Sequence, residues 1–303
     1  MANKIVIVGS SNTDMVVATS RLPLPGETVL GRDFVMAAGG KGANQAVAAT
    51  RLGGDVAFVA RLGQDLFGDE AVANFKKEGI DAGCIVRDPQ APSGVALIMV
   101  GPEGQNIIAV ALGANGYLTV EDVRKAQDLI ADARVVLLQL EIPLPTVAEA
   151  IRLARAAKCL IVLNPAPAQP LSPDLLRQVD ILTPNESEAM SLTGCQTPEM
   201  AADELLRQGV GTVIVTLGAE GVLVGVEGKP FERLHGFQVH AVDTTAAGDA
   251  FNGGLAVALA RGELLQAAVR YAQAVAALSV TKRGAQPSLP TGGEVQRFLE
   301  SMR

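Results

Sequence analysis

Short runs of β-branched and aliphatic residues recur along the chain, and longer helix-like stretches separate most of them. These runs are apolar throughout, which is typical of strands that are buried on both faces. Such strands, connected by helices, predict an α/β fold: a doubly wound, mainly parallel sheet with helices on both faces. The predicted strands are Ile5–Val8, Val56–Ala60, Val135–Leu140, Leu160–Leu163, Ile181–Thr183 and Val213–Thr216.

Two regions interrupt this rhythm, from about residue 14 to 36 and from 93 to 111. Both contain β-like segments, separated by proline and glycine, with no helical pattern between them. They predict a small accessory β-sheet inserted into one domain that spans residues 1–303. A flap of this kind can serve as a lid, because ligands of α/β folds bind beyond the carboxyl ends of the strands. Two surface hairpins would explain the same residues.

Charge and composition exclude several classes of partner. The net charge of -7 disfavours nucleic acid, which is usually bound by a clustered basic surface. Cys84, Cys159 and Cys195 lie far apart, so neither a disulfide framework nor a CxxC metal site is predicted. No apolar stretch has the length of a membrane span or of a signal-peptide core. We therefore expect a cytoplasmic protein with no nucleic-acid or membrane partner.

The segment from Asp243 to Gly254 carries the clearest chemical signal. Small residues lead directly into a helical pattern that runs to Ala260, and free backbone N–H groups at such a helix start can hold a phosphate. Asp249 lies at the same end, where it can take a proton from an attacking hydroxyl while the amides of Ala247 and Gly248 stabilise the transferring phosphoryl group. An Asp that only caps a core helix would explain the residue equally.

A second glycine-rich segment, Gly39–Asn44, opens another helical pattern. Its glycines allow a ligand to approach the backbone closely, and Lys41 and Asn44 supply hydrogen-bond donors. Asn12 and Asp14, after the first strand, can bind neighbouring hydroxyls of a polyhydroxylated substrate. A glycine-rich turn with a solvated lysine is the alternative.

Two further segments are consistent with nucleotide binding. Asn185–Glu188 follows a strand, and one of its carboxylates can orient a hydrated magnesium ion, although acidic residues also cap helices. Thr216–Gly221 lies between two predicted strands, where its glycines can admit a nucleotide or simply form a hairpin turn. Neither a P-loop nor a GxGxxG fingerprint is present.

Taken in this order, the motifs resemble those of the PfkB-type carbohydrate kinases, most closely their ribokinase branch, over essentially the whole chain. The matching motifs are GSxNxD at Gly9–Asp14, GGKGANQA at Gly39–Ala46, NxxE at Asn185–Glu188 and DTxAAGDxFNG at Asp243–Gly253.

The resemblance implies an ATP-dependent kinase that phosphorylates the 5-hydroxyl of a sugar. Asp249 would be the general base, and Ala246, Ala247 and Gly248 would form the anion hole. The sugar site would comprise Asn12, Asp14, Gly40, Lys41, Gly42, Asn44, Glu141 and Asp249. The ATP site would comprise Asn185, Thr216, Gly218, Gly221, Gly248 and Gln273, with Glu188 holding Mg²⁺ through water.

The resemblance also implies a potassium ion beside the anion hole, bound mostly by backbone carbonyls. Its site would comprise Asp243, Thr245, Ser279, Lys282, Gly284 and Ser288. In this family the lid strands commonly pair in a dimer, so a homodimer formed through the lid is expected.

The sequence AAGD at Ala246–Asp249 is the one found in ribokinases, whereas many fructokinase-like relatives have GAGD. This difference favours ribose as the sugar. A related kinase for fructose, 2-keto-3-deoxygluconate or a nucleoside is the alternative within the family. A sugar-binding regulator without turnover is a third possibility, but it would be expected to lack the base or the magnesium carboxylate, and Asp249 and Glu188 are both present.

Overall fold

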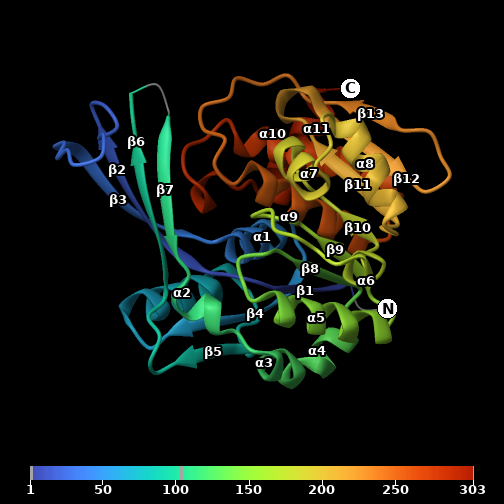
Figure 1. Cartoon of the computed structure of the whole chain (residues 1–303), viewed down its shortest axis with the longest axis horizontal. Helices are drawn as coiled ribbons and strands as arrows, with labels where there is room; N and C mark the ends of the chain where they lie inside the picture. Colours follow the sequence, from blue (N-terminus) through green and yellow to red (C-terminus); the bar gives the residue numbers. More distant parts are fainter. Residues whose placement is uncertain (1–2, 103–104, 303) are drawn as a thin grey trace.

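A nine-stranded sheet forms the centre of the computed structural model, which describes residues 3–102 and 105–302 (Figure 1). The strand order is β13-β12-β11-β10-β9-β8-β1-β4-β5, and only the pairs β11–β12 and β12–β13 are antiparallel. The doubly wound, mainly parallel sheet is confirmed. Its strands are β1 (Lys4–Val8), β4 (Asp55–Gly63), β5 (Ile85–Asp88), β8 (Val135–Leu138), β9 (Leu160–Leu163), β10 (Ile181–Leu182), β11 (Thr212–Thr216), β12 (Gly221–Val226) and β13 (Glu232–His235).

Helices cover both faces of this sheet, as the continuous apolar strands predict. Ile5 and Ile7 of β1 belong to one buried cluster, and Val6 and Val8 belong to a second on the opposite face. Helices of the first face are α1 (Lys41–Arg51), α2 (Leu66–Glu78), α9 (Ala247–Ala260), α10 (Leu265–Ser279) and α11 (Gly292–Ser301). Helices of the second are α3 (Val120–Lys125), α4 (Gln127–Ala131), α5 (Leu144–Ala156), α6 (Pro173–Leu176), α7 (Glu186–Thr193) and α8 (Pro198–Arg207).

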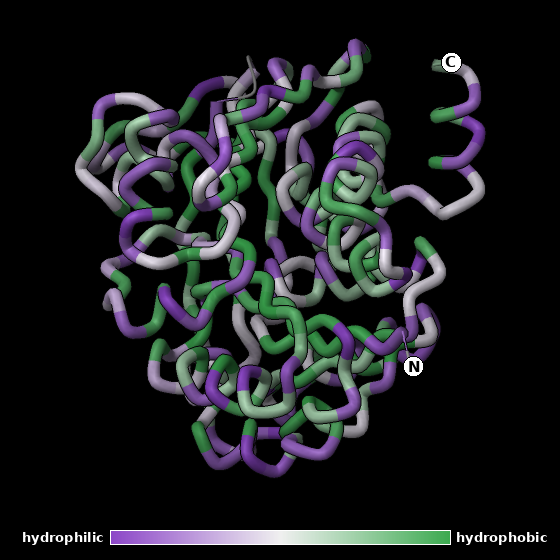
Figure 2. Tube along the Cα trace, turned by 90° about the vertical axis from the view of Figure 1, so that its right-hand side faces the viewer, coloured by the Kyte–Doolittle hydropathy of each residue, from purple (hydrophilic) through white to green (hydrophobic). Residues whose placement is uncertain are grey.

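The hydropathy of the chain follows these layers. In Figure 2 hydrophobic segments gather in the interior and hydrophilic ones at the periphery. Each fully buried aliphatic side chain contributes roughly 1.5–3 kcal/mol to folding. The two clusters therefore hold the helices firmly against the two faces of the sheet. No helix in the described part of the chain is long and apolar enough to cross a bilayer.

The two irregular regions form a separate four-stranded sheet, which we call the lid, and which stands beside the main sheet in Figure 1. The accessory sheet is thus confirmed, although residues 103 and 104 of the second region lie outside the described residues. Its order is β3-β2-β6-β7, with strands β2 (Asn12–Thr19), β3 (Gly31–Gly39), β6 (Gly94–Val100) and β7 (Asn106–Ala111).

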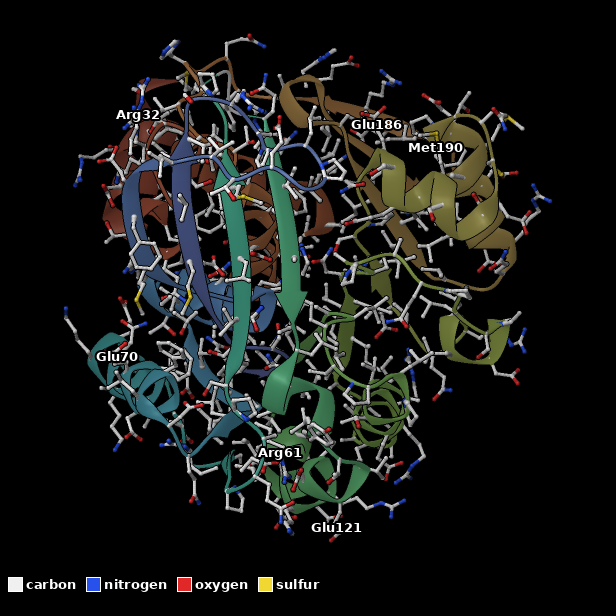
Figure 3. All side chains as sticks on the ribbon, turned by 60° about the vertical axis from the view of Figure 1, so that its left-hand side comes forward. Arg32, Arg61, Glu70, Glu121, Glu186 and Met190 are labelled. Atoms are coloured by element: carbon white, nitrogen blue, oxygen red, sulfur yellow. The ribbon has the colours of Figure 1, made fainter. Side chains whose placement is uncertain are left out.

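The register of the lid strands assigns their side chains to two faces. Asp14 pairs with Ala37 and Ala96, so these three side chains share one face. Met15 pairs with Met36 and Leu97, which lie on the other face. In Figure 3 the lid strands are seen in front, with Arg32 near the tip of the sheet and α7, marked by Glu186 and Met190, past the β7 edge.

Candidate active site

The predicted base and the predicted sugar-binding residues meet at the carboxyl edge of the large sheet, where α1 and α9 begin. Polar residues follow β1, β8, β9 and β10 at this edge, because each strand stops as its apolar run ends. The predicted strands Val135–Leu140 and Ile181–Thr183 are correspondingly too long: β8 ends at Leu138 and β10 at Leu182. Glycines let α1 approach this edge, since a Cβ on Gly42 would lie 2.6 Å from the backbone nitrogen of Ser10.

Asp249 is the most enclosed acidic residue of the site, with 6% of its surface exposed. Its Oδ2 accepts a hydrogen bond from the Nδ2 of Asn44 at 2.9 Å, and its Oδ1 accepts one from the Nε2 of Gln45 at 3.0 Å. Burial raises the pKa of Asp249, while the charge of Lys41 and the two amide hydrogen bonds oppose that rise. Its side-chain hydrogen bonds go to α1 and not to the backbone at the start of α9, so the alternative of a simple helix cap is not supported.

The orientation of the Asn44 amide follows from chemistry. An ionised carboxylate can only accept hydrogen bonds, so the nitrogen of Asn44 must face Asp249. The Oδ1 of Asn44 is then buried without a hydrogen-bond partner among the described residues. A buried acceptor left unpaired costs about 1–3 kcal/mol, and a hydroxyl donor from a ligand would satisfy it.

The start of α9 has the features of an anion site. Ala246, the residue before the helix, has a left-handed φ of 60°, a strained conformation for alanine that recurs at functional sites. The Ala247 N–H donates to the carbonyl of Thr244 at 3.2 Å within this turn. A Cβ built on Gly248 would meet nothing within 4 Å, so there is open space at this helix start. Gly248 therefore provides the accessible backbone of the predicted anion hole.

Lys41 is surrounded by carboxylates. Burial lowers the pKa of its ammonium, but the charges of Asp249, Glu141 and Glu188 outweigh this and raise the pKa overall. Burial also raises the pKa of Asp14, from 3.8 to about 6, with the charges of Glu141 and Asp249 adding to the effect. The site thus concentrates acceptors for ligand hydroxyls around one cation.

Two residues that the sequence analysis did not select, Asn115 and Ser10, help to fix Asn12 and Glu141. Asn115, in the 3₁₀ turn after β7, accepts from the Ser11 N–H, so its nitrogen is the atom that donates to the Oδ1 of Asn12 at 2.8 Å. Asn12 is left with its amide nitrogen as a donor for a ligand. Glu141 accepts from the hydroxyl of Ser10 at 2.5 Å and from the Lys41 N–H at 3.1 Å.

Asn185 and Glu188 form a reciprocal cap at the start of α7. Each side chain accepts a hydrogen bond from the other residue's backbone N–H at 2.8 Å. Burial raises the pKa of Glu188, whereas the Asn185 N–H and the charge of Lys41 lower it. These hydrogen bonds therefore support the capping alternative. The Glu188 carboxylate also interacts with the positive charge of Lys41. No group of three or more potential metal ligands occurs within residues 3–102 and 105–302.

Thr216 is the last residue of β11, and Gly218 begins the 3₁₀ turn (Gly218–Glu220) that leads into the antiparallel β12. This loop is a hairpin connection, and a Cβ on Gly218 would meet nothing within 4 Å. Gly221 is tightly packed, since a Cβ there would lie 2.1 Å from the Leu234 carbonyl oxygen. Gln273, on α10, donates to that same carbonyl at 2.8 Å, so its amide is engaged with β13.

Of the residues expected around potassium, hydrogen bonds bring Asp243, Thr245 and Gly284 together, whereas Ser279 ends α10 and Ser288 lies in a 3₁₀ turn. Asp243 accepts from the backbone and hydroxyl of Thr245, and its other oxygen accepts from the Gly284 N–H at 2.8 Å. Burial opposes ionisation of Asp243, but these hydrogen bonds outweigh it and lower its pKa. The hydroxyls of Ser279 and Ser288 donate to nearby backbone carbonyls.

Lys282 differs from the other members of this set, because its ammonium pairs with Glu294 at 2.8 Å. Its side chain is therefore directed to α11, and only its backbone remains available to a cation.

Comparison with known proteins extends over the whole site. A model of the pfkB family carbohydrate kinases matches residues 2–292. The chain is 45% identical over 305 residues to the ribokinase of Haemophilus influenzae, and the match covers 99% of both sequences. The structure of Thermotoga maritima ribokinase is similar with a TM-score of 0.90 at 39% identity, covering 98% of this chain and 99% of that one. Arabidopsis thaliana ribokinase complexed with ribose and ATP gives 0.90 at 33% identity, covering 99% of each chain.

Proposed function

Because the chain belongs to the pfkB family of carbohydrate kinases, we propose that it transfers the γ-phosphate of ATP to the 5-hydroxyl of D-ribose. The observation that carries this proposal is the buried Asp249 at the start of α9, where Gly248 leaves open space for a phosphoryl group. The solved ribokinase that holds ribose and ATP has the same fold over 99% of this chain.

The proposed reaction uses Asp249 as the base. Its carboxylate takes the proton of the 5-hydroxyl, the hydroxyl oxygen forms a bond to the γ-phosphorus, and the bond from that phosphorus to the ADP oxygen breaks. The raised pKa of Asp249 suits this task, since a base works best with a pKa near the working pH. Backbone amides at the Gly248 end of α9 stabilise the negative charge that develops on the phosphoryl group.

The sugar is bound by groups of complementary polarity. Asn12 donates through its free amide nitrogen, Asp14 and Glu141 accept from hydroxyls, and the unpaired Oδ1 of Asn44 accepts one more. Gly40 and Gly42 let the start of α1 pack against the backbone of residues 10–12, which brings it into the proposed sugar site, and Lys41 adds a positive charge beside the transferring phosphate.

Nucleotide binding is assigned to the edge formed by α7 and the β11–β12 loop. Asn185, Thr216, Gly218 and Gly221 would contact ATP, and Gln273 would line the adenine end through α10. The carboxylate of Glu188 suits Mg²⁺, which keeps several waters and needs few protein ligands. When bound, this ion neutralises charge on the phosphates of ATP.

We assign the potassium site to the segments that Asp243 joins, where residues 243, 245, 279, 282, 284 and 288 would bind the ion, mostly through backbone carbonyls. A cation there would steady the amides at the start of α9. We expect faster turnover in potassium than in sodium buffer at equal ionic strength, measured as ADP release. Equal rates would contradict the assignment.

Sugar affinity should depend on the protonation of Asp14. Because its pKa is raised to about 6, Asp14 is an ionised acceptor at pH 8 and gains a proton as the pH falls below about 6. We expect the KM for ribose to rise by about tenfold between pH 7 and pH 5, the change that one pH unit below the pKa gives for a binding-competent anion. The Asp14→Asn variant should bind ribose weakly, and its KM for ribose should no longer rise between pH 7 and pH 5. A pH-independent wild-type KM would contradict this role.

We further propose a homodimer formed through the lid, with the face opposite Asp14 as the interface. Exposed apolar side chains line that face, including Leu97 (56% exposed) and Phe34 (59%). Contiguous apolar surface of this kind marks interaction sites. Leu97→Asp should therefore give a monomer in sedimentation velocity, whereas Leu66→Asp, at an equally exposed leucine of α2 (67%), should not. A wild-type protein that sediments as a monomer would contradict the proposal.

An acceptor screen tests the substrate assignment. ADP release is compared for ribose, 2-deoxyribose, fructose, 2-keto-3-deoxygluconate and adenosine at equal concentrations with Mg²⁺ and K⁺. We expect the highest kcat/KM with ribose, because Asp14 and Glu141 then find hydroxyl donors. Preference for another acceptor would support the kinase activity but reject ribose as the substrate.

We place the protein in the cytoplasm, where its three free cysteines stay reduced.

A further inference from the structure

Buried amide side chains continue from the proposed base into the protein. Gln45 is fully buried on α1, and its Nε2 contacts two oxygens, Oδ1 of Asp249 at 3.0 Å and Oδ1 of Asn164 at 3.2 Å. Its Oε1 accepts from the Nε2 of Gln139 at 2.5 Å. Gln139 and Asn164 directly follow β8 and β9, so the ends of two neighbouring strands hold the amide that faces Asp249.

Two independent constraints fix the orientation of the Gln45 amide. The Asp249 carboxylate can only accept, which requires a nitrogen at the Gln45 atom that faces it. Asn164 donates its Nδ2 to the carbonyl of Thr183 at 3.0 Å, and a carbonyl also only accepts, so Asn164 must present its oxygen to Gln45. Both constraints give the same orientation. Gln45 thus uses both amide hydrogens on protein groups and has none to offer a ligand.

This row of hydrogen-bonded side chains (Gln139, Gln45 and Asn164) continues toward the proposed anion hole. The hydroxyl of Thr183, which follows β10, donates to Oδ1 of Asn252 at 2.6 Å, and Nδ2 of Asn252 donates to the Gly248 carbonyl at 2.8 Å. Buried hydrogen-bond networks rigidify the groups that they connect, although here the Oε1 of Gln139 has no partner among the described residues. One row of side chains therefore contacts the base at one end and the first turn of α9 at the other.

From this geometry we propose that Gln45 is a positioning residue for phosphoryl transfer, which holds the Asp249 carboxylate in its ionised form and aims it at the acceptor hydroxyl. The proposal rests on the function proposed above and adds a residue to it. Gln139 and Asn164 fix the Gln45 amide, and Thr183 and Asn252 tie the same edge to Gly248. Asn44 holds the other carboxylate oxygen and faces the sugar, whereas Gln45 lies behind the carboxylate.

The charged groups that face Asp249 do not change when the neutral Gln45 is replaced. Lys41 on α1 favours ionisation of Asp249, and Glu141 after β8 and Asp14 on the lid disfavour it. Loss of the Gln45 hydrogen bond should therefore raise the pKa of Asp249 against a constant background. Fewer molecules would then carry the ionised base at neutral pH.

The test is the pH dependence of kcat for Gln45→Met, which keeps the side-chain length and removes the amide. We expect its acid limb to move upward by about one pH unit, the effect of one buried hydrogen bond to a charge. At pH values below both acid limbs, where kcat follows the ionised fraction of Asp249, kcat should fall by roughly tenfold, with the KM for ribose within about twofold of wild type. The profile of kcat is used because the ionisation of Asp14 acts on KM.

Controls separate this role from a loss of stability. Thr146→Val removes a buried hydrogen bond to the Leu118 carbonyl on the far face of the sheet, and should lower the melting temperature without moving the acid limb. In an Asp249→Asn background, Gln45→Met should lower kcat no further, because the residue acts through the base. An unchanged acid limb, or a full additional loss in the double variant, would overturn the proposal.

Two further measurements keep the proposal testable. If Gln45→Met does not fold, Gln139→Met removes the hydrogen bond that Gln45 accepts through its Oε1, and its acid limb should move in the same direction by less; no movement would overturn the proposal. The ¹³C carboxyl resonance of Asp249, identified by its loss in Asp249→Asn, should titrate at higher pH in Gln45→Met without any substrate. Absence of turnover in the wild type would reject the proposed function, and this titration would still decide the role of Gln45.

Discussion

Asp249→Asn is expected to lower kcat by roughly 10²–10⁴-fold, the usual contribution of a positioned general base. The asparagine keeps the size of the side chain and its place beside Asn44 and Gln45, so binding of ribose and ATP should persist. Steady-state ADP release gives kcat, and isothermal titration gives the two dissociation constants.

Asp128→Asn is the matched control, because Asp128 is exposed on α4, on the other face of the sheet. Its kcat should equal that of the wild type. An Asp249→Asn protein with wild-type kcat would remove Asp249 from the mechanism, and one that binds neither substrate would show that its effect is not on chemistry.

Lys41→Met should have the second largest effect. Lys41 is the strongest influence that keeps the buried Asp249 ionised, and it also faces the proposed phosphate position. Loss of one such electrostatic contact costs about 10²-fold or more in kcat. The acid limb of kcat should also move upward, since a higher pKa leaves Asp249 protonated until a higher pH is reached.

Lys77→Met, at an exposed lysine of α2, controls for the general loss of one positive charge. We expect it to leave kcat and its pH dependence unchanged. A Lys41→Met enzyme with a lower kcat but an unmoved acid limb would limit the lysine to phosphate binding, and full activity would exclude it from the site.

The sequence predicts the fold well because the strands are continuous apolar runs. The six predicted strands exist, and side chains of β1 alternate between the two clusters. Strand ends are less predictable. Gln139 and Thr183 continue apolar or β-branched runs, yet each leaves the sheet to place its side chain in the polar row behind the site. The hairpin alternative for Thr216–Gly221 is confirmed, since β11 and β12 pair antiparallel.

The candidate site was predicted where glycines mark a close approach to a helix start, and the structure brings Asn44 and Asp249 together as expected. Gln45 was not selected, because within the sequence it is one polar position of a helical pattern. Only the tertiary placement of Gln139 and Asn164 gives it a role. Asn115 was missed for a similar reason, since between two glycines it reads as an ordinary turn residue.

The central claim is most directly tested by following ribose and MgATP with the protein by ³¹P NMR. We predict that the γ-phosphate signal is replaced, one for one, by a phosphomonoester whose carbon–phosphorus coupling places it on C5 of ribose, while ADP accumulates. Release of inorganic phosphate without a sugar phosphate, or an unchanged ATP spectrum, would contradict the assignment of this protein as a ribose-phosphorylating kinase.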